Sequence, residues 1–142
     1  MATVRSANAH WEGSLIEGSG TVELASSGQA TFGVTWPSRS EEANGKTSPE
    51  ELIAAAHSTC YSMALSHGLS GAGTPPTTVD TSADVTFQPG QGITGIHLTV
   101  KAAVPGLTAE QFAEAAENAK QNCPVSAALT GTTITLDATL VD

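Results

Sequence analysis

At 142 residues, with 39% hydrophobic and 13% charged residues, the chain is long enough for one folded domain, which we expect to cover residues 1–142. Its net charge of -9, with five scattered basic side chains, argues against a nucleic-acid partner because an acidic surface repels phosphate. The N-terminal residues lack the apolar core of a signal peptide, and no run of about 18 apolar residues occurs, so we expect a cytoplasmic protein with no membrane partner.

The first part of the chain predicts β-strands joined by turns. Apolar and polar residues alternate over 10–12, 21–25 and 30–36, with a polar turn before the last of these segments. Residues 37–46, which include Arg39, are polar and contain glycine, so a loop is expected there. Three strands therefore precede the first helix.

A long helix is predicted over about 49–67. Ser48 is a suitable N-cap, Pro49 fits the first helical position, and Glu51 completes a capping box. Gly68 then marks the expected end of the helix. Because no charged residue follows Glu51 within it, this helix should be buried, with cover on more than one side.

The rest of the chain predicts a mixture of strands and helices. Thr108 and Gln111 form a second capping box before an amphipathic helix, and the Asn-Cys-Pro sequence at 122–124 opens a short third helix. The order βββ-α-ββ-α-α-β indicates an α+β fold with antiparallel sheets and a long buried central helix. Alternation and β-branched residues place the strands at 81–87, 93–104 and 132–141.

Several familiar signatures lack the context that they need. The glycine pattern at 90–95 matches a dinucleotide-binding fingerprint by letter, but a β-rich run follows it where a helix is required, so a hairpin turn is expected. The four histidines have no HExxH or CxxC companion, which argues against zinc. A Gly-Xaa-Ser-Xaa-Gly elbow of serine hydrolases is also absent from the sequence.

The two cysteines are the main candidates for chemistry. In a reducing compartment, Cys60 and Cys123 are more plausibly free or reversibly oxidised than a permanent crosslink. Burial in the long helix should raise the pKa of Cys60, whereas Cys123 stands beside a helix N-cap whose unpaired N–H groups stabilise a thiolate. Local physics alone therefore favours Cys123 as the nucleophile. The structural alternative is that both thiols only pack as small hydrophobic groups.

A cationic group would be needed to ionise Cys60. Arg39, just before the long helix, is the best-placed basic residue, and Glu50 is the natural carboxylate to hold its guanidinium. Glu50 and Cys60 are ten residues apart, about 15 Å along a helix, so one guanidinium cannot touch both in the same chain. A twofold dimer would let the pair from one subunit approach Cys60 of the other. Arg5 and the nearby His57 remain alternatives for the activating group.

Four segments closely resemble the osmotically inducible protein C (OsmC) branch of the OsmC/Ohr family: Ala9–Gly13, Ser48–Ile53, Cys60–Leu65 and Asn122–Ser126. The similarity runs along essentially the whole chain. It implies an intertwined α+β homodimer with two sites at its interface. The implied activity is that of a thiol-dependent peroxidase in oxidative and osmotic stress defence, reducing organic hydroperoxides and, less efficiently, hydrogen peroxide. No bound cofactor or metal is implied, and the reductant would be an external dithiol or a lipoyl-type system.

The resemblance also implies a role for each site residue. Cys60 would be the peroxidatic cysteine, Cys123 the resolving cysteine, Glu50 the orienting carboxylate and Arg39 the thiolate-activating arginine. The first attack is thereby assigned to Cys60 rather than to Cys123, with a sulfenic acid and then a disulfide as products. Two other readings stay open: a redox-sensing or small-molecule binding module that uses the same pocket without fast turnover, and a purely structural protein.

Overall fold

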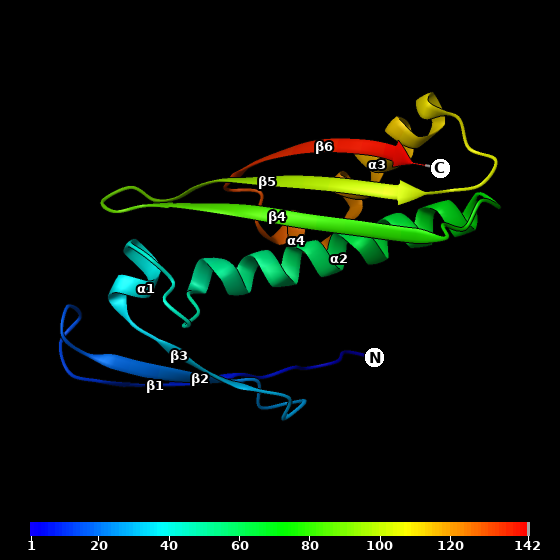
Figure 1. The fold of residues 1–142 in the computed structure, drawn as a ribbon. Helices are drawn as coiled ribbons and strands as arrows, with labels where there is room; N and C mark the ends of the chain where they lie inside the picture. The colour runs from blue at the N-terminus through cyan, green and yellow to red at the C-terminus, as the bar shows by residue number, and fades with distance from the viewer. Residues whose placement is uncertain (142) are drawn as a thin grey trace. The chain divides into compact units, whose positions relative to one another are not determined.

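A computed structural model describes residues 1–141 of the chain. These residues belong to two compact units, Met1–Leu52 and Ile53–Asp142, which are described separately. Figure 1 labels the helices and strands of both. The chain has an α+β fold with two three-stranded sheets and a long helix, in the order βββ-α-α-ββ-α-α-β. No helix among residues 1–141 is long and apolar enough to cross a membrane.

The first unit contains the three strands that the sequence predicts. They are β1 (Asn8–Glu12), β2 (Ser19–Glu23) and β3 (Thr31–Val34), and they form an antiparallel sheet in the order β1-β2-β3. A parallel bridge between Val34 and Thr47 then ties the end of β3 to the segment that precedes the long helix.

A short helix, α1 (Trp36–Ser40), occupies the start of the segment predicted as a loop. Its N-cap is Thr35, whose hydroxyl accepts a hydrogen bond from the Ser38 N–H at 3.1 Å, while the Ser38 hydroxyl accepts one from the Thr35 N–H at 3.0 Å. Pro37 suits the first turn because it has no N–H to satisfy. The loop prediction is therefore wrong here, since a capping box of two hydroxyl residues supplies the start signal that Glu or Gln usually supplies.

The long helix, α2 (Pro49–Gly71), begins as predicted but only half of the expected capping box forms. The Glu51 N–H donates to the Ser48 hydroxyl at 3.1 Å. The Glu51 carboxylate accepts a 2.6 Å hydrogen bond from the Thr47 hydroxyl instead of reaching back to the cap.

The prediction that α2 ends at Gly68 is wrong, because the helix continues for another turn. Glycine inside a helix costs about 1 kcal/mol relative to alanine. The extra turn brings Leu69 into the core, where it is 1% exposed, and burial of a leucine contributes about 2 kcal/mol. Packing therefore outweighs the local stop signal.

The second unit contains a sheet of β4 (Thr78–Gln88), β5 (Gly92–Ala103) and β6 (Thr133–Val141). β4 and β5 are antiparallel, but β5 and β6 are parallel, so the expectation of purely antiparallel sheets is wrong. The arrows of β5 and β6 point the same way in Figure 1. The reason is the connection: α3 (Ala109–Asn122) and α4 (Pro124–Ala128) lie between the two strands, and such a crossover joins parallel neighbours.

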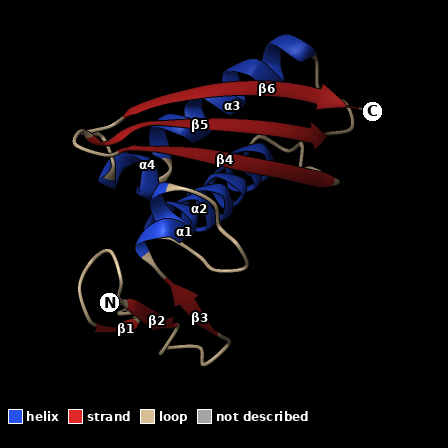
Figure 2. Cartoon of the chain, turned by 60° about the vertical axis from the view of Figure 1, so that its left-hand side comes forward, coloured by secondary structure: helices blue, strands red, loops and turns tan. Residues whose placement is uncertain are grey.

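The helices of the second unit lie against one side of its sheet (Figure 2). β5 contributes every second residue to the core between sheet and helices, as expected for a strand with one covered face. α3 starts at the predicted Thr108–Gln111 capping box and buries Phe112. The buried apolar cluster consists of Tyr61, Leu65 and Leu69 of α2, Ile96, Leu98, Val100 and Ala102 of β5, Phe112 and Ala119 of α3, and Val104 and Cys123.

Within the single chain, α2 is covered on one line of residues rather than on several sides. His57, Tyr61, Leu65 and Leu69, spaced four apart, are each at most 1% exposed. Met63, on another face of the same helix, is 67% exposed. The described chain therefore leaves part of the predicted apolar surface of α2 open.

Candidate active site

The two cysteines meet in the second unit. The Sγ atoms of Cys60 and Cys123 lie 3.1 Å apart although 63 residues separate them in the sequence. Both are free thiols. A disulfide bond measures about 2.05 Å, so the pair is in non-bonded contact and requires only a small movement to react.

The local structure around Cys123 explains its position. It is both the C-cap of α3 and the N-cap of α4, and Pro124 prevents α3 from continuing. Its backbone N–H closes α3 by donating to the Ala119 carbonyl at 2.9 Å. The side chain of Cys123 is fully buried, whereas Cys60, in the middle of α2, is half-buried.

The surroundings of the two sulfur atoms favour different protonation states. Burial raises the pKa of Cys60, and its hydrogen bond with Cys123 raises it further. Burial alone would also raise the pKa of Cys123, but hydrogen bonds from the Cys60 thiol, from the Ser126 N–H and hydroxyl, and from the Val125 N–H outweigh it and lower the pKa. This confirms the sequence-based expectation that Cys123 is the more acidic thiol.

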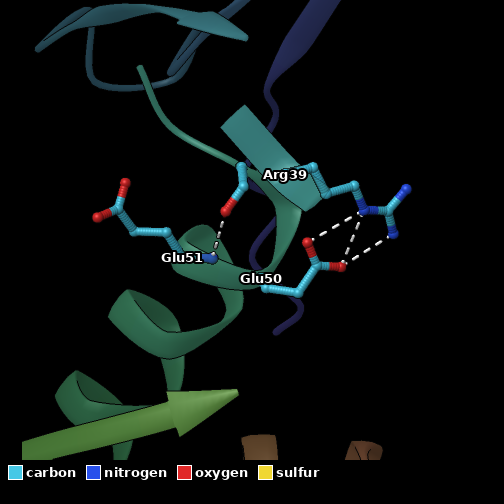
Figure 3. A network of polar contacts seen from close by, with 4 residues as sticks. Arg39, Glu50 and Glu51 are labelled. Carbon is cyan, nitrogen blue, oxygen red and sulfur yellow. Dashed lines mark hydrogen bonds and ion pairs between the residues drawn. The ribbon is translucent and has the colours of Figure 1, made fainter. Parts of the chain in front are cut away.

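Arg39 and Glu50 form an ion pair in the first unit. The Arg39 Nε atom donates to Glu50 Oε1 at 3.0 Å and to Oε2 at 3.1 Å, and a terminal nitrogen donates to Oε2 at 2.9 Å. Figure 3 shows the guanidinium facing Glu50, while the Glu51 side chain points elsewhere. α1 and the first turn of α2 supply the two partners, and Glu50 is only 6% exposed. The predicted pairing is confirmed, and its two-point geometry fixes the plane of the guanidinium.

His57 does not pair with Cys60, although it stands three residues before it on α2. Its Nε2 atom lies 2.7 Å from the Ser126 hydroxyl oxygen, and both side chains are buried. Arg5, the other alternative, is exposed and donates to the Val4 carbonyl at 3.0 Å. Sequence reasoning missed Ser126 as a partner; the only signal was its position three residues after Cys123.

Metal ligands do not cluster in the part of the chain that the structure describes. Among residues 1–141 there is no group of three or more His, Cys, Asp or Glu side chains that could hold a metal ion.

Two free thiols in contact inside an α+β unit define a thiol-based redox protein. The family model described as OsmC-like protein matches residues 42–137, and the chain belongs to this family. It is 44% identical over 142 residues to the protein named Peroxiredoxin OsmC of Escherichia coli strain K12, covering 96% of each chain, and is equally similar to the protein of that name from Shigella flexneri. The chain is thus a homologue of a named peroxiredoxin, a class of cysteine-based peroxidases.

Solved structures share the fold. An organic hydroperoxide resistance protein OsmC from Legionella pneumophila superposes with a TM-score of 0.71 at 22% identity, with 100% of this chain and 99% of that chain covered. An OsmC-like protein from Mycoplasma pneumoniae gives a TM-score of 0.75 at 16% identity, with both chains fully covered. At such identities the likeness concerns the fold, and it agrees with the α+β assignment.

Proposed function

We propose that this protein is a single OsmC-like domain that works in the cytoplasm as a thiol-dependent peroxidase. Its substrates are organic hydroperoxides and, less efficiently, hydrogen peroxide, in defence against oxidative and osmotic stress. The observation that carries the proposal is the 3.1 Å contact between the sulfur atoms of Cys60 and Cys123, in a chain 44% identical to a peroxiredoxin. Contact between two thiols is what reversible disulfide chemistry requires.

In the proposed reaction, the Cys60 thiolate attacks the distal oxygen of the hydroperoxide. The O–O bond breaks, the leaving alkoxide takes a proton and departs as the alcohol, and Cys60 becomes a sulfenic acid. The Cys123 thiolate then attacks the Cys60 sulfur, the S–O bond breaks, and the hydroxide leaves as water after taking a proton. An external dithiol or lipoyl-type reductant restores both thiols by two exchange steps. The protein's own residues need no bound cofactor for these steps.

The high pKa of Cys60 in the single chain makes a positive neighbour necessary for the first step. We assign this role to Arg39, with Glu50 orienting the guanidinium through the hydrogen bonds already described. Ten residues of α2 separate Glu50 from Cys60, about 15 Å of helix, so the pair that serves Cys60 comes from a second copy. The exposed Met63 on α2 supports this homodimer, because it leaves an apolar surface for that copy to cover.

Mass spectrometry and turnover together test the proposal. One equivalent of cumene hydroperoxide should lower the mass of the reduced protein by about 2 Da as both thiols disappear. A product that gains one oxygen while Cys123 stays free would reject Cys123 as the resolving residue.

Turnover separates an enzyme from a sensor. With excess dithiol, an enzyme consumes peroxide continuously, whereas a single stoichiometric burst would indicate a redox-sensing module. A Cys60→Ser variant should consume none, and unchanged consumption by this variant would reject the proposed nucleophile.

A further inference from the structure

The proposed peroxidase cycle leaves one buried pair of side chains without a role. His57 is 0% exposed and Ser126 is 4% exposed, and the His57 Nε2 atom lies 2.7 Å from the Ser126 hydroxyl oxygen. Ser126 is the third residue of α4, whose N-cap is Cys123, and its side chain contributes to lowering the pKa of the Cys123 thiol. The Ser126 hydroxyl therefore stands between His57 of α2, which it contacts, and the first turn of the helix that Cys123 caps.

The protonation of His57 follows from its surroundings. Burial lowers the pKa of His57, so the imidazole is neutral at pH 7 and carries one N–H. Its Nδ1 atom is buried and has no hydrogen-bond partner among residues 1–141. A buried N–H without a partner is rarer in proteins than a buried acceptor without one. The hydrogen is therefore on Nε2, and Nδ1 is the bare nitrogen.

This tautomer decides what the Ser126 hydroxyl can do. A hydroxyl has one hydrogen to donate and two lone pairs that accept. If His57 Nε2–H donates to the Ser126 oxygen, the single hydroxyl hydrogen is left for the Cys123 sulfur. With the other tautomer, Ser126 would donate to the imidazole and could not donate to the sulfur.

We propose that His57 is a positioning residue for the resolving step, because its Nε2–H orients the Ser126 hydroxyl to donate to the Cys123 sulfur. The inference rests on the proposed role of Cys123. The oriented hydroxyl stabilises the thiolate that attacks the Cys60 sulfenic acid. In that step the S–S bond forms and the S–O bond breaks. The proton released earlier by Cys123 balances the one taken up by the leaving hydroxide.

Hydrogen bonds account for the lowered pKa of Cys123, because no charged group contributes to it. The titratable groups of α2 nearest to this thiol are Cys60 and Tyr61, while His57 contacts Ser126. On α3, Lys120 pairs with Glu117 at 3.2 Å. Tyr61 stays protonated because burial raises its pKa, and its hydroxyl donates to the Ala116 carbonyl at 2.9 Å. Loss of the Ser126 hydroxyl should therefore raise the pKa of the Cys123 thiol.

The test measures the fate of the Cys60 sulfenic acid. Each variant is oxidised with one equivalent of cumene hydroperoxide in the presence of dimedone, and mass spectrometry gives the ratio of disulfide to dimedone adduct over pH 6–10. We expect His57→Leu and Ser126→Ala to slow disulfide formation roughly tenfold at neutral pH, the effect of losing one hydrogen bond to a charged group. The oxidation of Cys60 should keep its rate. The deficit should vanish at high pH, where Cys123 ionises unaided.

Two amide variants keep the test independent of folding problems. His57→Gln places an amide nitrogen near the position of Nε2 and should form the disulfide at close to the wild-type rate. His57→Asn places its amide near Nδ1, out of reach of Ser126, and should behave like His57→Leu. The exposed His67, on the same helix, gives the control variant His67→Leu, which should match the wild type.

The outcomes separate this inference from the proposed function. Disulfide formation at the wild-type rate in His57→Asn, or equal slowing in His57→Asn and His57→Gln at every pH, would overturn the role of the Nε2–H. Failure of the wild-type protein to form the Cys60–Cys123 disulfide would instead reject the proposed function, and this is visible without any variant.

Discussion

Cys60 and Cys123 share one contact but differ in what surrounds each sulfur. Cys60 stands in the middle of a helix, and burial and its contact with Cys123 raise its pKa more than the hydrogen bond from the Val125 backbone lowers it. Cys123 stands at the junction of two helices, where free N–H groups and a hydroxyl lower its pKa. The pKa of Cys123 is thus lowered within its own chain, whereas Cys60 in the proposed mechanism needs an added positive charge.

The proposed dependence of Cys60 on Arg39 gives a first prediction. Arg39→Ala removes the proposed counter-charge, so the rate of Cys60 oxidation by cumene hydroperoxide should fall about 10- to 100-fold at pH 7, the effect of a guanidinium on a neighbouring acid. Stopped-flow measurement of thiol loss gives this rate. Arg5→Ala is the matched control, because Arg5 is exposed and bonded to its neighbour's carbonyl, and it should react like the wild type. An unchanged rate in Arg39→Ala would transfer the activating role to another group.

Tyr61 gives a prediction about stability and pH. Burial raises its pKa, so above about pH 10 the unfolded chain releases the phenol proton while the folded chain retains it. Stability should therefore fall as the pH rises through this range, by up to about 1.4 kcal/mol per pH unit. Tyr61→Phe loses the hydrogen bond to Ala116, about 1 kcal/mol at pH 7, but should flatten this alkaline decline. Urea unfolding at pH 7 and pH 11 measures both effects, and an equally steep decline in the variant would contradict the assignment.

At the scale of elements, the sequence is informative where the signal is local. Caps and alternation predict β1 to β6, α2, α3 and α4, and the helix start at Cys123. The parallel pairing of β6 was missed because strand direction depends on the path of the intervening helices. The contact between His57 and Ser126 was missed for a similar reason, since 69 residues separate them and no periodicity relates α2 to α4.

Gly68 in the last turns of α2 gives a prediction at this scale. A Cβ added there meets no heavy atom within 4 Å in the described chain, so Gly68→Ala should stabilise the fold by about 0.5–1 kcal/mol through helix propensity. The matched control is Gly73→Ala: that site is equally open, but its φ of +88° makes a side chain unfavourable, and stability should fall. Thermal unfolding compares the two. A loss of stability in Gly68→Ala would mean that a second copy packs closely at this position.

At the scale of the whole molecule, the proposed active site needs more than one chain. The Arg39–Glu50 pair could be predicted from one sequence because both residues flank the same helix start. The approach of this pair to Cys60 of another copy stays a prediction, because it depends on how copies assemble. Met63 on α2 is a large apolar side chain that is 67% exposed in the described chain, and we propose that a second copy covers it.

A mixing experiment decides which chain supplies the arginine. Arg39→Ala and Cys60→Ser should each be almost inactive alone. If the site combines Arg39 of one subunit with Cys60 of the other, a mixed dimer of these two variants contains one intact site. Equal mixing after reversible unfolding should then restore about a quarter of wild-type activity, since about half of the dimers are mixed and each has one working site of two. Peroxide consumption with excess dithiol measures the recovery, and light scattering verifies that dimers have reformed. With both groups drawn from the same chain, the mixed dimer has no intact site, and activity would stay at the level of the separate variants.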